Sequence, residues 1–149
     1  MTVIQIGNLV SSSVEVTSRI HDLLTERSPE LGLSKVYYGR QDLMPEFPSA
    51  CVESFPKSRA WNGAGRRMEV TLRTGILVYV SKIQSSTITK KESEQLAEAI
   101  EVILHEDFTL GDRVIHGMVT RMDYGVSRVE DVMIRSVRIQ WEASSREQF

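Results

Sequence analysis

The segment Met68–Ser81, MEVTLRTGILVYVS, decides the fold, because mostly apolar residues fall on alternate positions along the whole stretch. This period of two is that of a β-strand. The opposite face begins polar and becomes apolar at Leu77 and Tyr79, so half of the strand is predicted to be buried on both sides. Gly75 lies at the change and predicts a bulge or a bend. The first face comprises Met68, Val70, Leu72, Thr74, Ile76, Val78 and Val80.

This predicted strand is long for a chain of 149 residues. At roughly 3.3 Å per residue it would span about 45 Å, whereas strands usually hold about 5–6 residues. Its ends are expected either to bend sharply or to project and pack on another chain. We favour projection into an oligomer.

The first helix is predicted near the N-terminus. Ser12 and Ser13, followed by Glu15, form a typical capped start, because a serine oxygen and an acid three residues on satisfy free N–H groups. Apolar residues then recur at helical spacing to about Arg27. Ser28-Pro29 ends the helix, because the residue before proline is pushed out of the α region.

The second helix is predicted to begin at a capping box formed by Thr89 and Glu92. Its apolar stripe consists of Leu96, Ala97, Ile100, Ile103 and Leu104, and a separate acidic face consists of Glu94, Glu98 and Glu101. Such an acidic face is usually only solvated, and it would gain a role if it lined a channel for DNA, whose phosphates it would repel.

Shorter patterns complete the order of elements. Further strands are predicted at Lys35–Gly39, Ala50–Ser54, Arg113–Tyr124 and Met133–Ala143; loops at Met44–Pro48 and Phe55–Arg67; and a hairpin connection at Gly125–Val132. Thr2–Val10 either extends the first helix or lies as an arm on a neighbour. The order α-β-β-β-α-β-β predicts one α+β domain over residues 1–149, with a mostly antiparallel or mixed sheet of about five strands and two main helices packed on it.

The composition is that of a globular protein, with 41% hydrophobic and 26% charged residues and a net charge of −2. It excludes the disordered, collagen and membrane-spanning classes and argues against a dedicated nucleic-acid binder. Cys51 is the only cysteine, so an internal disulfide and a cysteine-rich zinc site are excluded. The first residues lack a signal-peptide pattern, and we expect a soluble protein made in the cytoplasm.

Residues for catalysis are few and scattered. His21, His105 and His116 have no metal-ligand spacing. His105 is explained by the dipole at a helix C-terminus, and Cys51 is expected to be a buried structural thiol. We therefore predict no catalytic residue, no cofactor and no metal.

The predicted loop Phe55–Arg67 carries the candidate interface residues Lys57, Arg59, Trp61, Arg66 and Arg67. Its glycines do not make a phosphate loop, because no Lys-Ser/Thr follows and no helix begins there. An aromatic residue among arginines is typical of a protein-interface anchor and also of a platform that stacks single-stranded nucleic acid. The protein interface is favoured, because no basic surface continues along the chain.

With these elements in order, the chain resembles the bacteriophage tail terminator, or tail-completion, family. The resemblance rests on an N-terminal helix, the strand pair around Val36–Tyr38 and Cys51–Glu53, the long strand Met68–Val80, the helix Thr89–Leu104, and a closing hairpin in which Val119–Gly125 leads into Met133–Trp141. It covers nearly the whole chain and is a match of arrangement, so no individual residue takes a role from it.

The resemblance implies a structural protein of the virion tail or neck, assembled in the host cytoplasm. Six copies would form a ring that caps the tail tube and joins it to the head–tail connector, with DNA passing through the channel without specific binding. Two other readings stay open: another neck subunit, such as a head-closure or tube-like protein, or a ferredoxin-like regulatory domain that binds a small molecule. An enzyme is a third, and it would need Cys51, a histidine and an acid in one pocket.

Overall fold

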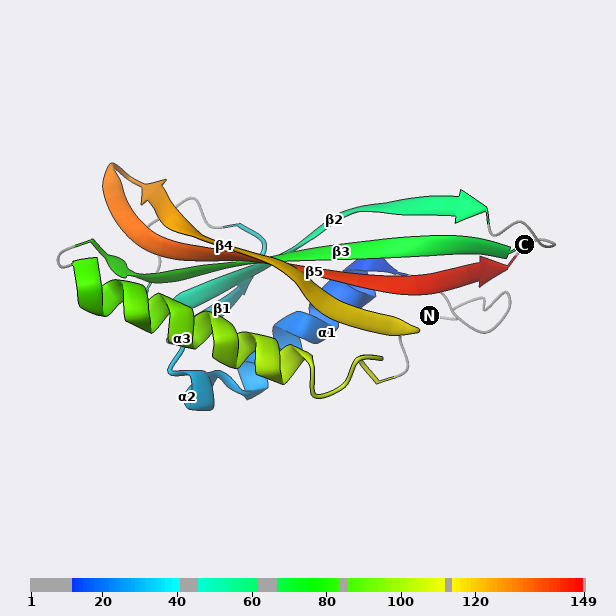
Figure 1. Ribbon diagram of the computed structural model, residues 1–149, viewed down its shortest axis with the longest axis horizontal. Coiled ribbons are helices and arrows are strands. Elements are labelled where there is room, and N and C mark those ends of the chain that lie inside the picture. Colours follow the sequence, from blue (N-terminus) through cyan, green and yellow to red (C-terminus); the bar gives the residue numbers. More distant parts are fainter. Residues whose placement is uncertain (1–11, 41–45, 62–66, 84–85, 112–113, 149) are drawn as a thin grey trace.

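The computed structural model describes residues 12–40, 46–61, 67–83, 86–111 and 114–148. Its elements follow the predicted order, with one short extra helix (Figure 1). They are α1 (Ser13–Glu26), α2 (Ser28–Leu31), β1 (Lys35–Tyr38), β2 (Ser49–Trp61), β3 (Arg67–Lys82), α3 (Ser86–Leu104), β4 (His116–Val129) and β5 (Val132–Gln148). The predicted α+β class with a mixed sheet of five strands is confirmed.

The sheet has the strand order β1-β2-β3-β5-β4. β1 runs parallel to β2 and pairs with it only from Ser49 to Val52. All other neighbours are antiparallel. The two long strands β3 and β5 lie at the centre, so β2 and β4 flank them on opposite sides.

Both main helices lie on one face of the sheet (Figure 1). Ile20 and Leu24 of α1, and Ala97 and Ile100 of α3, are fully buried against the apolar face of the strands. The predicted face of β3 is confirmed from Val70 to Val80, and its β5 counterpart is Val137, Ile139, Trp141 and Ala143. At the centre of this layer the hydroxyls of Thr17 and Thr74 share a buried hydrogen bond of 3.0 Å.

The opposite face of the sheet is buried at one end only. There Leu77 and Tyr79 pack with Cys51, Ile134 and Val129 in a second, smaller cluster. The rest of this face is mostly polar, as the change of pattern along β3 predicts, with Phe55 and Met118 as partly exposed apolar residues. Cys51 is 1% exposed, which agrees with the expected buried thiol.

The prediction of a loop over Phe55–Arg67 is wrong, because β2 continues to Trp61 and β3 begins at Arg67. Pro56 falls in a register shift between Phe55 and Ser58. A proline has no N–H to offer a ladder, and an irregular position on an edge strand tolerates it. Residues 62–66 lie outside the described chain.

The prediction of a bulge at Gly75 is also wrong. Gly75 pairs regularly with Glu53 and Gln140, and the irregularity of β3 falls between Tyr79 and Ser81. Glycine is required for a different reason: a Cβ at this position would lie 2.5 Å from the Phe55 ring. Because Gly75 has no side chain, the Phe55 ring can lie directly over it.

The hairpin between β4 and β5 is confirmed, but its strands are longer than predicted. Regular pairing continues through Gly125 to Val129 opposite Val132, so the connection Gly125–Val132 reduces to two residues. Glu130 and Asp131 both have positive φ, at 49° and 63°, as a tight two-residue hairpin turn requires. Met133, the first residue of the strand predicted at Met133–Ala143, is 49% exposed.

The helix boundaries agree in part. The Ser12 hydroxyl accepts the N–H of Glu15, so the predicted cap of α1 is confirmed. Pro29 ends α1 as predicted but opens α2, because a proline is tolerated in a first helical turn. α3 begins at Ser86, which places Thr89 inside the helix and overturns its role as the cap. Thr2–Val10 lies outside the described residues.

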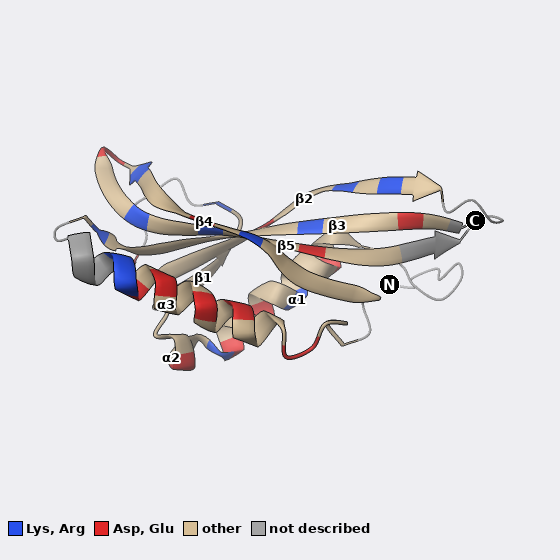
Figure 2. Cartoon of the chain, viewed as in Figure 1, with Lys and Arg blue, Asp and Glu red and all other residues tan. Residues whose placement is uncertain are grey.

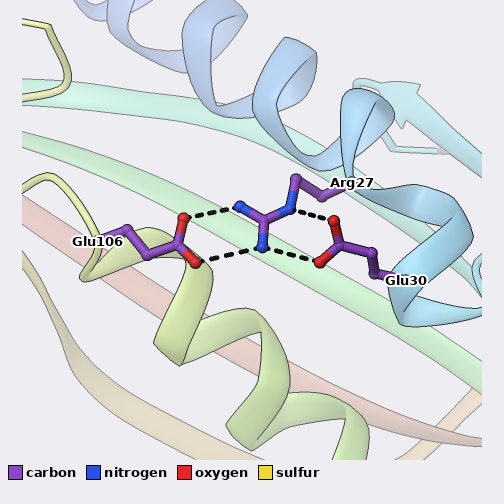
Figure 3. A network of polar contacts seen from close by, with 3 residues as sticks. All are labelled: Arg27, Glu30 and Glu106. Carbon is purple, nitrogen blue, oxygen red and sulfur yellow. Dashed lines mark hydrogen bonds and ion pairs between the residues drawn. The ribbon is translucent and has the colours of Figure 1, made fainter.

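Arg27 joins the ends of the three helices (Figure 3). Its guanidinium donates to both carboxylate oxygens of Glu30 at 2.8 Å, and to those of Glu106, just beyond α3, at 2.7 and 3.2 Å. The hydrogen bond with Arg27 lowers the pKa of Glu30. The hydrogen bonds with Glu30 and Glu106 raise the pKa of Arg27, and the one with Glu30 has the larger effect. The network fixes α2 against the end of α3.

A substitution at Gly117 tests the packing of the central core. A Cβ at this position would overlap the indole of Trp141, which is 1% exposed and cannot move aside. Gly117→Ala should lower the free energy of unfolding by about 1–3 kcal/mol, the usual cost of overpacking, in urea titrations. Gly125→Ala on the same strand is the control, because its Cβ meets nothing within 4 Å. Equal stability of the two variants would contradict this packing.

Acidification should weaken the Arg27 network. Because the folded pKa of Glu30 is lowered from 4.5, its contribution to stability is complete above about pH 4.5 and is lost as the pH falls through the lowered value. The melting temperature of Arg27→Gln should therefore fall less than that of the wild type between pH 5 and pH 3. Arg19→Gln, whose contact with Glu26 is longer at 3.7 Å, should follow the wild type. An unchanged slope in Arg27→Gln would show that the network does not couple to folding.

Candidate assembly surface

The far half of β2, Glu53–Trp61, is an exposed strand edge, here called the β2 edge. β1 pairs with β2 only as far as Val52, so in the described chain nothing pairs with this side of β2 beyond that point. Ser54, Phe55 and Pro56 are exposed, as is every residue from Ser58 to the end of the strand. Between Ser54 and Trp61 there are two basic residues and no acid.

The structure places three of the five predicted interface residues on the β2 edge. Arg59 lies opposite the buried Val70, and Trp61 lies opposite Met68. Because directly opposed residues point to the same side of a sheet, both side chains lie on the face that carries the helices. Trp61 is 66% exposed.

The structure says less about the side chains of Lys57, Arg66 and Arg67. Lys57 lies in the irregular stretch of β2 and is half-buried. Arg66 lies outside the described residues, and of Arg67 the structure describes only the backbone, which opens β3.

The outer side of β4 is a second strand edge. In the described chain β4 pairs only with β5, and most of its side chains are exposed. The stretch Arg121–Val129 is here called the β4 edge. On its helix side it carries a row of apolar residues at alternate positions: the half-buried Met122, then Tyr124 at 44% and Val126 at 45% exposure.

The acidic residues of α3 lie beside this row. Burial raises the pKa of Tyr124, and the negative charges of Glu98, Glu94 and Glu101 raise it further. None of the three glutamates forms an ion pair with another described residue. Figure 2 shows acidic residues along α3 and basic residues along the far half of β2. The two edges of the sheet therefore differ in charge.

Sequence reasoning found the first edge, although it described it as a loop, and missed the second. The only signal for the β4 edge is the spacing of Met122, Tyr124 and Val126, which fits a strand with one uncovered apolar face. Their position next to the glutamates of α3 is a product of the fold.

The helix-free face of the sheet carries a groove of about 300 Å³. Arg40, Glu53, Phe55, Arg138 and Gln140 are among its lining residues. This volume is at the lower limit of small-molecule sites, and Phe55, Leu77 and Ile139 line the groove together with the charged groups. Nearby, Arg73 donates to Glu142 at 3.0 Å.

The residues that an enzyme would need are held separately by structural contacts. His21 bonds through Nε2 to the carbonyl of Val36 at 3.1 Å. The Nε2 atom of His105 accepts the backbone N–H of Val119 at 2.9 Å. This hydrogen bond gives His105 a structural role just beyond the end of α3. His116 stacks on Phe108 with ring centres 5.0 Å apart.

The described residues hold neither a metal-binding cluster nor a helix that could cross a membrane. Over the residues that the structure describes, no group of three or more His, Cys, Asp or Glu side chains could hold a metal ion. Of the described helices, none is long and apolar enough to cross a membrane.

Comparisons with known proteins find a distant structural neighbour. No family model matches the chain, and no curated protein matches it. Among solved structures the chain is similar to one from the virion of a native gene transfer agent particle, at 13% identity and a TM-score of 0.49, over 89% of this chain and 95% of that one. A similarity of this size assigns no family, function or residue role to this chain.

Proposed function

We propose that this chain is a non-enzymatic structural subunit of a phage virion, a tail terminator that assembles as a ring on the tail tube and joins it to the head–tail connector. The observation that carries the proposal is the sheet itself, which ends on both sides in a long exposed strand edge. An unpaired row of N–H and C=O groups is a template for another chain. Soluble monomers usually avoid or cover such edges.

The two edges favour a ring over a two-fold dimer. The β2 edge and the β4 edge belong to opposite sides of one sheet and differ in charge. A contact between unlike surfaces is head-to-tail, and it closes into a ring when the rotation between copies allows. The resemblance to tail terminators supplies six copies, the tube and connector as partners, and a channel through which DNA passes unbound.

Trp61 and its basic neighbours are the proposed anchors of protein contact. The indole is 66% exposed at the tip of the sheet, where an aromatic side chain covers a large area at a low cost in conformational entropy. Basic residues beside an aromatic ring are frequent in interface hot spots. Lys57, Arg59, Trp61, Arg66 and Arg67 remain one interface segment in this proposal.

Electron microscopy and native mass spectrometry test the ring directly. Purified protein, alone and mixed with tail tube protein, should give ring-shaped oligomers and capped tubes, with masses that are multiples of the subunit. If only monomers form, with and without tubes, the proposed function is wrong. If rings form but bind the connector and never the tube, the protein is another neck subunit.

Substitution of the anchors should weaken capping and leave the fold intact. Truncation of a hot-spot residue costs about 2 kcal/mol or more, so Arg59→Ala combined with Trp61→Ala should weaken tube capping about thirtyfold, as counted in micrographs. The circular dichroism spectrum and melting temperature should not change. Val14→Ala, which removes an apolar side chain that is 62% exposed on α1, is the control. Normal capping by the double variant would remove the role of the anchors.

A further inference from the structure

We propose that the β2 edge of one copy pairs antiparallel with the β4 edge of the next, with Arg59 opposite Tyr124 and Trp61 opposite Met122. The inference rests on the proposed self-assembly and specifies the contact that builds it. The partner is therefore a second copy of this chain, and the sheet continues from subunit to subunit.

A chain cannot make this contact with itself. β3 and β5 separate β2 from β4 in the sheet, so the two edges lie three strand spacings apart, about 14 Å. They also face outward, away from each other. Each copy therefore offers one edge to the copy before it and the other to the copy after it.

The direction of the strands fixes the type of pairing. Antiparallel pairing across β2, β3, β5 and β4 makes β4 run opposite to β2. When two copies share one orientation, the β2 edge of the second therefore meets the β4 edge of the first as an antiparallel neighbour. Their helices then lie on the same side of the continuous sheet.

β1 fixes how far the copies are offset along the strands. It occupies the outer side of β2 from Ser49 to Val52, where it would collide with β4 if the copies were level. The contact can form only when β1 of the second copy lies beyond the hairpin turn at Glu130 and Asp131. This offset sets residues 53–61 of one copy against about residues 121–129 of the other.

The faces of the strands and the length of the contact then select the register, because a shift by two residues, with Arg59 opposite Val126, would leave fewer residues paired. Arg59 and Trp61 lie on the helix side of β2, and Met122 and Tyr124 lie on the helix side of β4. Directly opposed residues must share a face, and within the allowed offset this condition is met when Arg59 lies opposite Tyr124. Trp61 then lies opposite Met122.

Charge supports the same register independently. Arg59 of one copy arrives beside Tyr124, where Glu94, Glu98 and Glu101 of α3 supply negative charge. The charges of β4 itself are neutralised locally, since Arg121 binds Asp123 at 2.9 Å and Arg128 binds Asp131 at 3.1 Å. The three glutamates are thus free to attract the basic β2 edge, and complementary charge sets both partner and register.

Cysteine cross-linking tests the register on the opposite face, where the anchors are untouched. The proposed pairing sets Ala60 opposite Asp123. An equal mixture of Ala60→Cys and Asp123→Cys variants should form a disulfide-linked dimer under mild oxidation, because opposed Cβ atoms in a sheet lie close enough to bridge. Each variant alone is a control, with the buried Cys51 common to all.

A mixture of Ala60→Cys and Met118→Cys is the matched control. Met118 is 42% exposed on the other half of β4 and should not cross-link. Equal yields from the two mixtures, or a greater yield from Met118→Cys, would overturn the register. Rings that form without a cross-link at Asp123 would overturn this inference alone, whereas failure of every copy to associate, with or without tubes, would overturn the proposed function.

Charge reversal tests the attraction between the edges. Lys57→Glu with Arg59→Glu, and separately Glu94→Lys with Glu98→Lys and Glu101→Lys, should each weaken self-association at least tenfold in sedimentation, roughly the effect of close charge pairs. Mixing the two variants should restore association between unlike copies. Glu26→Lys, on α1, should have no effect. If the glutamates instead line the DNA channel, their reversal will leave association unchanged and the inference is wrong.

Discussion

The mismatch between long strands and short helices governs the structure. β3 and β5 hold 16 and 17 residues, about 53 and 56 Å at roughly 3.3 Å per residue. α1 and α3 hold 14 and 19 residues, about 21 and 28 Å at roughly 1.5 Å per residue. Two such helices, both on one face, cannot cover the sheet from end to end. Exposed strand surface therefore follows from the lengths of the elements.

This mismatch explains why the two faces are composed differently. Beneath the helices the strand residues are apolar, and the one polar pair, Thr17 and Thr74, satisfies itself with a buried hydrogen bond. On the helix-free face, Leu77 and Tyr79 are apolar only where the small second cluster covers them. Elsewhere that face is mostly polar, as Arg73 and its ion pair with Glu142 illustrate. Along each strand, the residues are apolar where other parts of the fold bury them and mostly polar where they face solvent.

The sequence predicted the elements whose pattern is local and failed where the fold decides. The alternation of β3, the serine cap of α1 and the apolar stripe of α3 each reflect a period within one segment, and each is confirmed. The loop predicted at Phe55–Arg67 contains Pro56, which an irregular position on an edge strand tolerates. Gly75 was taken as a bulge, because nothing local reveals that Phe55 packs over it. The acids of α3 and Tyr124 are far apart in sequence, so their proximity could not be predicted.

The two edges also decide which kind of assembly is favoured. A two-fold dimer joins like to like, so pairing between two β2 edges would bring Lys57 and Arg59 close to their own copies. Pairing between two β4 edges would bring two sets of α3 glutamates together. Both arrangements juxtapose like charges, which costs binding energy. The unlike pairing avoids both penalties. In the proposed assembly each copy keeps one free edge of each kind, so association would continue until a ring closes.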